Sequence, residues 1–80
     1  MEIVNKLPDR KQFVIGTREI AKAVQAGKLK RVIIASNCPD YLIDKFTDMK
    51  GVLLEKFFED ESQLGTKLGK PFPVAMVGYE

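Results

Sequence analysis

Short apolar runs alternate along the chain with segments in which apolar residues recur at helical spacing. The runs expected to form strands lie at residues 12–15, 32–35, 52–58 and 74–77. Apolar positions three and four apart predict helices over residues 17–26 and 40–49, and a shorter helix between Asp60 and Gly69. Strands that alternate with helices indicate a layered α/β fold whose sheet is covered on both faces.

The first seven residues have a weaker pattern. Ile3, Val4 and Leu7 are spaced as on a helix, and Pro8 ends whatever forms there. Further along, Thr17 is the expected N-cap of the first long helix, because its hydroxyl can accept a hydrogen bond from the first turn. The sequence therefore predicts at most a short N-terminal helix ahead of the first strand.

Eighty residues are expected to form a single domain over residues 1–80. The hydrophobic fraction of 45% and the charged fraction of 30% are those of an ordinary globular protein. A net charge of +2 indicates a nucleic-acid partner only if the basic residues are gathered on one surface. The apolar runs are too short to cross a membrane, and Cys38 has no second cysteine to pair with, so we expect a cytoplasmic protein.

Enzyme chemistry has little support in the sequence. The chain has no histidine, which removes Ser-His-Asp and Cys-His nucleophilic schemes and the commonest zinc ligand. The acidic run Glu59-Asp60-Glu61 is best read as a solvated helix start, because no further carboxylate cluster accompanies it. Cys38 has no base beside it and is expected to be a small packed residue. We therefore expect no catalytic residue, metal, cofactor or small-molecule substrate.

The segment over residues 16–22 has the equipment to hold an anion or a base edge. A strand that runs into a helix through Gly16 and Thr17 presents unpaired N–H groups and the positive end of the helix dipole. Arg18 and Lys22 lie four apart on one helical face, and Glu19 beside them can accept hydrogen bonds from guanine. The plain alternative, a strand–helix turn with a solvated face, stays open on these residues alone.

A second candidate segment, Gly69-Lys70-Pro71-Phe72-Pro73, places an aromatic side chain on a stiff loop. Single-stranded bases stack on such aromatics. The alternative is that Phe72 folds inward and fills the core. The sequence alone leaves both orientations open.

The order of these segments resembles the kink-turn RNA-binding family of ribosomal proteins, which includes the archaeal and eukaryotic large-subunit proteins seven-Ae and thirty-e. The similarity covers residues 12–78 and rests on residues 16–22, on residues 32–39 with Asn37, and on residues 61–74. The last of these segments is most similar to the thirty-e branch.

This resemblance implies a three-layer α-β-α sandwich with a four-stranded mixed sheet. It also implies that Gly16 and Thr17 approach an RNA backbone, that Glu19 and Lys22 read guanines of G·A pairs, and that the loop around Phe72 covers an unstacked nucleotide. The residues so assigned to RNA binding are Gly16, Thr17, Arg18, Glu19, Lys22, Asn37, Gly69, Lys70, Pro71 and Phe72.

The expected function is that of a large-subunit ribosomal protein that binds a kink-turn in rRNA and stabilises its bend, with neighbouring ribosomal proteins as further partners. The chain departs from the family at Arg18, where the seven-Ae branch commonly has Asn, and at Pro73, where thirty-e proteins often have a basic residue. The family's N-terminal helix is reduced to residues 1–7. Two alternatives stay open: a free-standing kink-turn protein of a guide-RNA or RNA-processing particle, and a paralogue that acts mainly through protein contacts.

Overall fold

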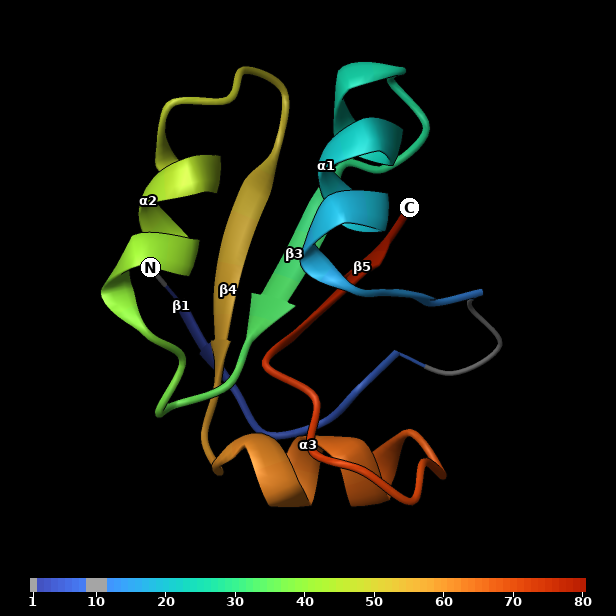
Figure 1. Cartoon of the computed structure of the whole chain (residues 1–80), viewed down its shortest axis with the longest axis vertical. Helices are drawn as coiled ribbons and strands as arrows, with labels where there is room; N and C mark the ends of the chain where they lie inside the picture. The colour runs from blue at the N-terminus through green and yellow to red at the C-terminus, as the bar shows by residue number, and fades with distance from the viewer. Residues whose placement is uncertain (1, 9–11) are drawn as a thin grey trace.

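The computed structural model describes residues 2–8 and 12–80. Within these ranges the chain forms three helices and one five-stranded sheet (Figure 1). The elements in chain order are β1 (Glu2–Val4), β2 (Val14–Ile15), α1 (Thr17–Gln25), β3 (Arg31–Ile34), α2 (Asp40–Thr47), β4 (Leu53–Phe57), α3 (Glu61–Lys67) and β5 (Met76–Tyr79). The predicted alternation of strands and helices is confirmed from residue 12 onward.

The strands lie side by side in the order β1-β4-β3-β5-β2. The central strand β3 is parallel to β4 and antiparallel to β5. At the two edges, β1 is parallel to β4 and β2 is antiparallel to β5. The sheet is therefore mixed, as expected, but it has five strands and not four.

The additional strand is β1, which forms where the sequence predicted a short helix. Val4 lies opposite Phe57 of β4, and the N–H of Phe58 extends the ladder by donating to the carbonyl of Val4 at 3.0 Å. The branched side chains of Ile3 and Val4 suit a pleated strand, and Val4 packs against the core cluster on one face of the sheet. Spacing over so few residues could not reveal this pairing, which depends on β4. Met1 and Asp9 lie outside the described residues.

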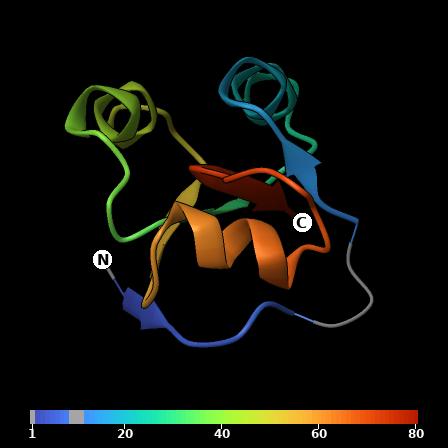
Figure 2. The ribbon, with the colours of Figure 1, turned by 60° about the horizontal axis from the view of Figure 1, so that its bottom comes forward.

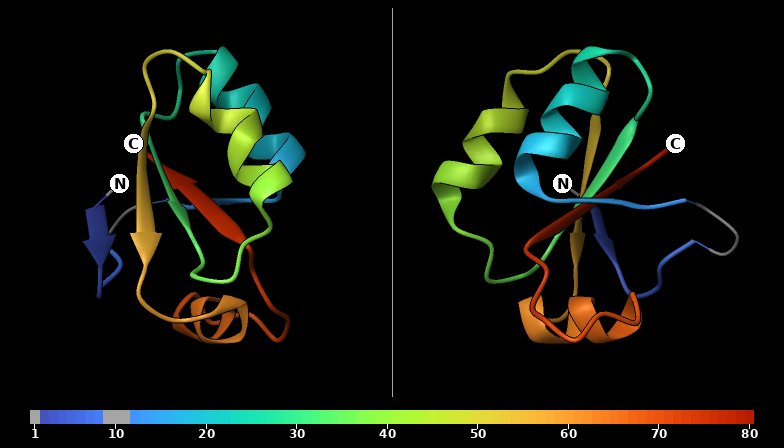
Figure 3. Two further views of the ribbon diagram at one scale, coloured as in Figure 1. Left: turned by 90° about the vertical axis from the view of Figure 1, so that its left-hand side faces the viewer. Right: turned by 45° about the vertical axis from the view of Figure 1, so that its right-hand side comes forward.

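The sheet is the middle of three layers. Helices α1 and α2 cover one face, and α3 crosses the opposite face at one end (Figures 2 and 3). A hydrophobic core lies on each face of the sheet, and alternate residues of β3 contribute to the two cores. Val32 and Ile34 pack on the α1/α2 side, whereas Ile33 packs with Phe57 and Leu64 on the α3 side. No helix in the described ranges is long and apolar enough to span a bilayer.

Candidate nucleic-acid interface

The N-terminal turn of α1 is the first predicted site segment. Gly16 is the N-cap and has φ of 102°, a backbone conformation that favours glycine, so Thr17 is the first helical residue and not the cap. Among the described residues, no side chain caps this turn. The first N–H groups of a helix have no partner within it, so those of this turn are available to a ligand.

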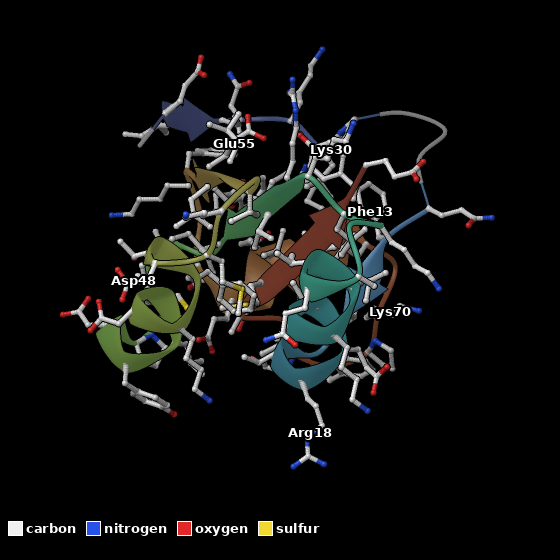
Figure 4. All side chains as sticks on the ribbon, turned by 90° about the horizontal axis from the view of Figure 1, so that it is seen from above. Phe13, Arg18, Lys30, Asp48, Glu55 and Lys70 are labelled. Atoms are coloured by element: carbon white, nitrogen blue, oxygen red, sulfur yellow. The ribbon has the colours of Figure 1, made fainter. Side chains whose placement is uncertain are left out.

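The charged residues of this helix lie on its solvent side. Ile20 and Val24 are buried against the sheet, whereas Arg18, Glu19 and Lys22 are exposed. Figure 4 shows Arg18 extending from α1 into solvent, away from the sheet. The spacing of the two buried residues therefore fixes which way the three charged side chains face.

The loop that follows α3 is the second predicted site segment. It begins at Gly69, where φ is 73°, and the N–H of Lys70 donates to the carbonyl of Gly65 at 2.9 Å. Pro71 and Phe72 then lie at the surface. Phe72 is 50% exposed, so its ring is not a core residue and has a free surface on which a base could stack.

Gly65 of α3 sets the position of this loop. A Cβ atom at residue 65 would collide with the backbone carbonyl oxygen of Phe72 and would lie 3.4 Å from Cα of Pro73. The loop therefore rests directly on the helix backbone, an approach that only glycine allows. This role of Gly65 was not predicted from the sequence, although a glycine inside an otherwise helical segment was the available signal.

Shallow depressions lie beside the two segments, and one of them is lined by both. One, of about 250 Å³, is lined by residues 15–17 and 72–76. Another, of about 290 Å³, lies between α3 and the loop and is lined by Ser62, Thr66 and residues 70–73. The third, of about 330 Å³, lies beside α1 and is lined by Val14, Glu19, Lys22, Ala23, Ala26 and Lys28. Phe72 lines the first two depressions, so the turn before α1 and the loop after α3 meet around its ring.

Asn37 lies apart from this assembly. Its Oδ1 atom accepts a hydrogen bond from the N–H of Glu61 at 2.9 Å, which ties the turn after β3 to the start of α3. The N–H of Ser36 also donates to the carbonyl of Glu59 at 3.0 Å. Asn37 lines none of the three depressions, and its observed bond is to the protein itself. Gly69 has a structural role of another kind, because its positive φ turns the chain toward Lys70.

Charge is distributed unevenly around the molecule. The two candidate segments carry Arg18, Lys22 and Lys70 with Glu19 as their acid, all exposed. The exposed carboxylates of α2 and of the turn after it are Asp40, Asp44 and Asp48. Figure 4 shows Asp48 extending on the α2 side of the molecule, opposite the α1 side. Exposed Lys45 on α2 offsets part of this negative charge, whereas the candidate segments have more cations than acids. An anionic ligand is therefore favoured at the candidate segments over α2.

Catalytic chemistry has no visible centre in the described part of the chain. Cys38 is buried, as predicted, and this burial raises the pKa of its thiol, so the reactive thiolate is disfavoured. The described residues contain no group of three or more Cys, Asp or Glu side chains placed to hold a metal ion.

Comparison with known proteins agrees with the architecture. Residues 1–80 match the ribosomal protein L7Ae/L30e/S12e/Gadd45 family. The chain belongs to this family. The resemblance predicted from the sequence is thus confirmed, and curated relatives of the L30e branch carry it further.

One such relative, the large ribosomal subunit protein eL30 of Archaeoglobus fulgidus, is 34% identical over 63 residues, which are 79% of this chain and 72% of that protein. The eL30 protein of Methanosarcina mazei is 36% identical over 65 residues, which are 80% of this chain and 61% of that protein. Similarity to eL30 proteins agrees with the predicted closeness to the thirty-e branch.

Solved structures include two similar members of the fold. A Bacillus halodurans protein of unknown function superimposes with a TM-score of 0.74 and 27% identity, over 85% of this chain and 70% of that one. The Giardia lamblia 15.5kD RNA binding protein superimposes with a TM-score of 0.65 and 25% identity, over 84% of this chain and 58% of that one. The L7Ae/L30e-type fold of this chain is therefore supported by both sequence and structure.

Proposed function

We propose that this protein is a ribosomal RNA-binding protein of the large subunit, and that it recognises a kink-turn or a related internal loop and stabilises the bend. Family membership, the eL30 relatives and the RNA-binding Giardia neighbour support this proposal. The observation that carries it is the meeting of the uncapped α1 turn with the half-exposed ring of Phe72 in one depression. Backbone donors and a stacking platform are then presented to the same ligand.

Each group has a role that follows from its chemistry. The N–H groups after Gly16 bind a phosphate or a base-edge acceptor, and Thr17 lies against the RNA backbone. Glu19 accepts hydrogen bonds from guanine N–H groups. A phosphate has no N–H donor, so this contact favours a base over the RNA backbone. Lys22 and Lys70 neutralise phosphates on either side, and an unstacked base lies on Phe72.

Replacing Phe72 by alanine is expected to weaken binding to a kink-turn RNA by about 1–3 kcal/mol, because a stacked base loses its platform. Because the ring is half exposed, the free energy of unfolding should change little. Binding is measured by titration and stability by denaturant unfolding. Tyr41→Ala on α2 is the matched control, because Tyr41 is 67% exposed and lies outside the candidate segments. Equal affinities for the two variants would remove Phe72 from the interface.

Replacing Glu19 by glutamine is expected to reduce discrimination between a kink-turn and the same RNA without its G·A pairs more than it reduces overall affinity. A carboxylate accepts two donors, whereas the amide of glutamine brings its own N–H groups toward them. The ratio of the two dissociation constants is the quantity to compare. Asp48→Asn provides the same loss of charge on the α2 side and should leave that ratio unchanged. A Glu19→Gln variant with an unaltered ratio would contradict the assigned role.

Two features favour a second candidate function, that of a paralogue that acts mainly through protein contacts. Arg18 points into solvent, and Pro73 occupies an exposed position where a basic residue would contact phosphate. Under that function, the Phe72→Ala and Glu19→Gln variants would still associate with ribosomal particles as the unchanged protein does. A free-standing role in a guide-RNA or RNA-processing particle would use the same interface on another RNA.

A further inference from the structure

The depression beside α1 extends the candidate surface beyond the residues assigned to RNA from the sequence. It lies between α1 and β2 and contains both Glu19 and Lys22, together with Lys28. Lys28 follows the C-terminal end of α1, and its side chain is exposed. The depression therefore runs from the first turn of the helix to the third residue past its last residue, Gln25.

The position of Lys28 is fixed by the way α1 ends. Gly27 has φ of 75° and donates its N–H to the carbonyl of Val24 at 3.0 Å, while the N–H of Lys28 donates to the carbonyl of Ala23 at 2.9 Å. This closed turn is the usual glycine-terminated helix end. It holds the backbone of Lys28 in place and leaves only its side chain to move, so the amino group has a defined reach.

The residues that line the depression suit contact with the phosphates of a nucleic-acid backbone. Lys22 and Lys28 supply positive charge at two points, and Ala23 and Ala26 between them are small enough for a backbone to approach. Glu19 lies at the end near Gly16, where the proposed function assigns its carboxylate to guanine N–H groups. The nine residues of α1 extend for about 13 Å at a rise of about 1.5 Å per residue. That length corresponds to roughly four base pairs of a nucleic-acid helix.

We propose that this depression binds the sugar–phosphate backbone of one RNA stem next to the bend, with Lys22, in the last turn of α1, between the bend and Lys28, and with Lys28 about four base pairs along the stem. This inference rests on the proposed function, because it needs the bend to be seated between Gly16 and Phe72. The stem contact is a second region of the interface, and it does not depend on the base sequence of the RNA. The stem lies along α1, and its length contributes to affinity.

The test is a titration of kink-turn RNAs whose two stems are shortened separately, from well beyond roughly four base pairs to about two. Shortening one particular stem is expected to weaken binding of the unchanged protein about twofold to fivefold, as for an exposed ion pair. The Lys28→Gln variant should bind the long-stem RNA as weakly as the unchanged protein binds the short-stem RNA. The affinity of this variant should not depend on the length of that stem. The slope of log affinity against log salt concentration should fall by about one unit.

Lys45→Gln is the matched control, since Lys45 is an exposed lysine on α2 whose loss changes the net charge equally. This variant should keep the full dependence on stem length. If Lys28→Gln keeps it too, or if neither stem affects the unchanged protein, the stem contact is wrong although the kink-turn function stands. If the unchanged protein does not prefer the bent RNA over a straight duplex, the proposed function fails and the stem contact fails with it.

Discussion

Replacing Gly65 by alanine is expected to lower the free energy of unfolding by about 2–3 kcal/mol, although alanine is the better helix former. The added methyl group meets the carbonyl oxygen of Phe72, a backbone atom that cannot move without displacing the whole loop. The same displacement carries the ring of Phe72 away from the turn at Gly16. We therefore expect kink-turn affinity to fall together with stability, as measured by titration under conditions in which the variant is folded.

Gln63→Ala is the control for this substitution, because Gln63 lies on the exposed side of the same helix. Its effect on the unfolding free energy should stay within about 0.5 kcal/mol. The alternative outcome is that Gly65→Ala is as stable as the unchanged protein or more so. Helix propensity would then dominate, and the close approach of the loop to α3 would not be a constraint on the fold.

Replacing Tyr79 by phenylalanine is expected to destabilise the protein by about 1–3 kcal/mol, since it leaves a buried polar group without its partner. The hydroxyl of Tyr79 donates to Oε1 of Glu55 at 2.7 Å, and both residues are buried. The two side chains reach toward each other across β3, since β4 and β5 flank that strand. Denaturant unfolding at neutral pH measures the loss, and Tyr41→Phe on the exposed side of α2 should show none.

The same hydrogen bond predicts a pH dependence. Burial, followed by the bond to Glu55, raises the pKa of Tyr79 above that of an unfolded tyrosine. The folded protein therefore retains this proton where the unfolded chain releases it. The stabilisation is complete below about pH 10, the usual pKa of tyrosine, and is lost as pH rises further. The stability advantage of the unchanged protein over Tyr79→Phe should shrink above that pH; a constant advantage would contradict the assignment.

The spacing of apolar and polar residues predicted the elements that depend on neighbouring residues in the sequence. Apolar residues three and four apart predicted α1, whose buried residues are Ile20 and Val24. The acidic run around Asp60 was read as a helix start, and α3 does begin there, with the N–H of Gln63 donating to Oδ1 of Asp60 at 3.0 Å. The strand β1 was not predicted, because three residues have no recognisable periodicity and their pairing depends on β4, about fifty residues away in the sequence.

The role of the two candidate segments in RNA binding stays a prediction, and the structure adds how they are placed. The sequence alone could not decide whether Phe72 faces in or out. That orientation depends on contact between its backbone and Gly65, seven positions earlier. Asn37 was assigned to RNA on resemblance, whereas its amide oxygen accepts from Glu61, twenty-four residues along the chain. Such partners are fixed by tertiary packing, which no local signal in one sequence reports.

If the surface from the α1 turn to the Phe72 loop recognises a sharply bent RNA, the unchanged protein should distinguish a kink-turn RNA from the same RNA without its G·A pairs. A titration against both RNAs at two salt concentrations tests this. We expect much tighter binding to the first RNA at both concentrations, with affinity falling as salt rises. Equal, weak binding to the two RNAs would contradict it, and affinity that does not change with salt would remove the phosphate contacts on which the account depends.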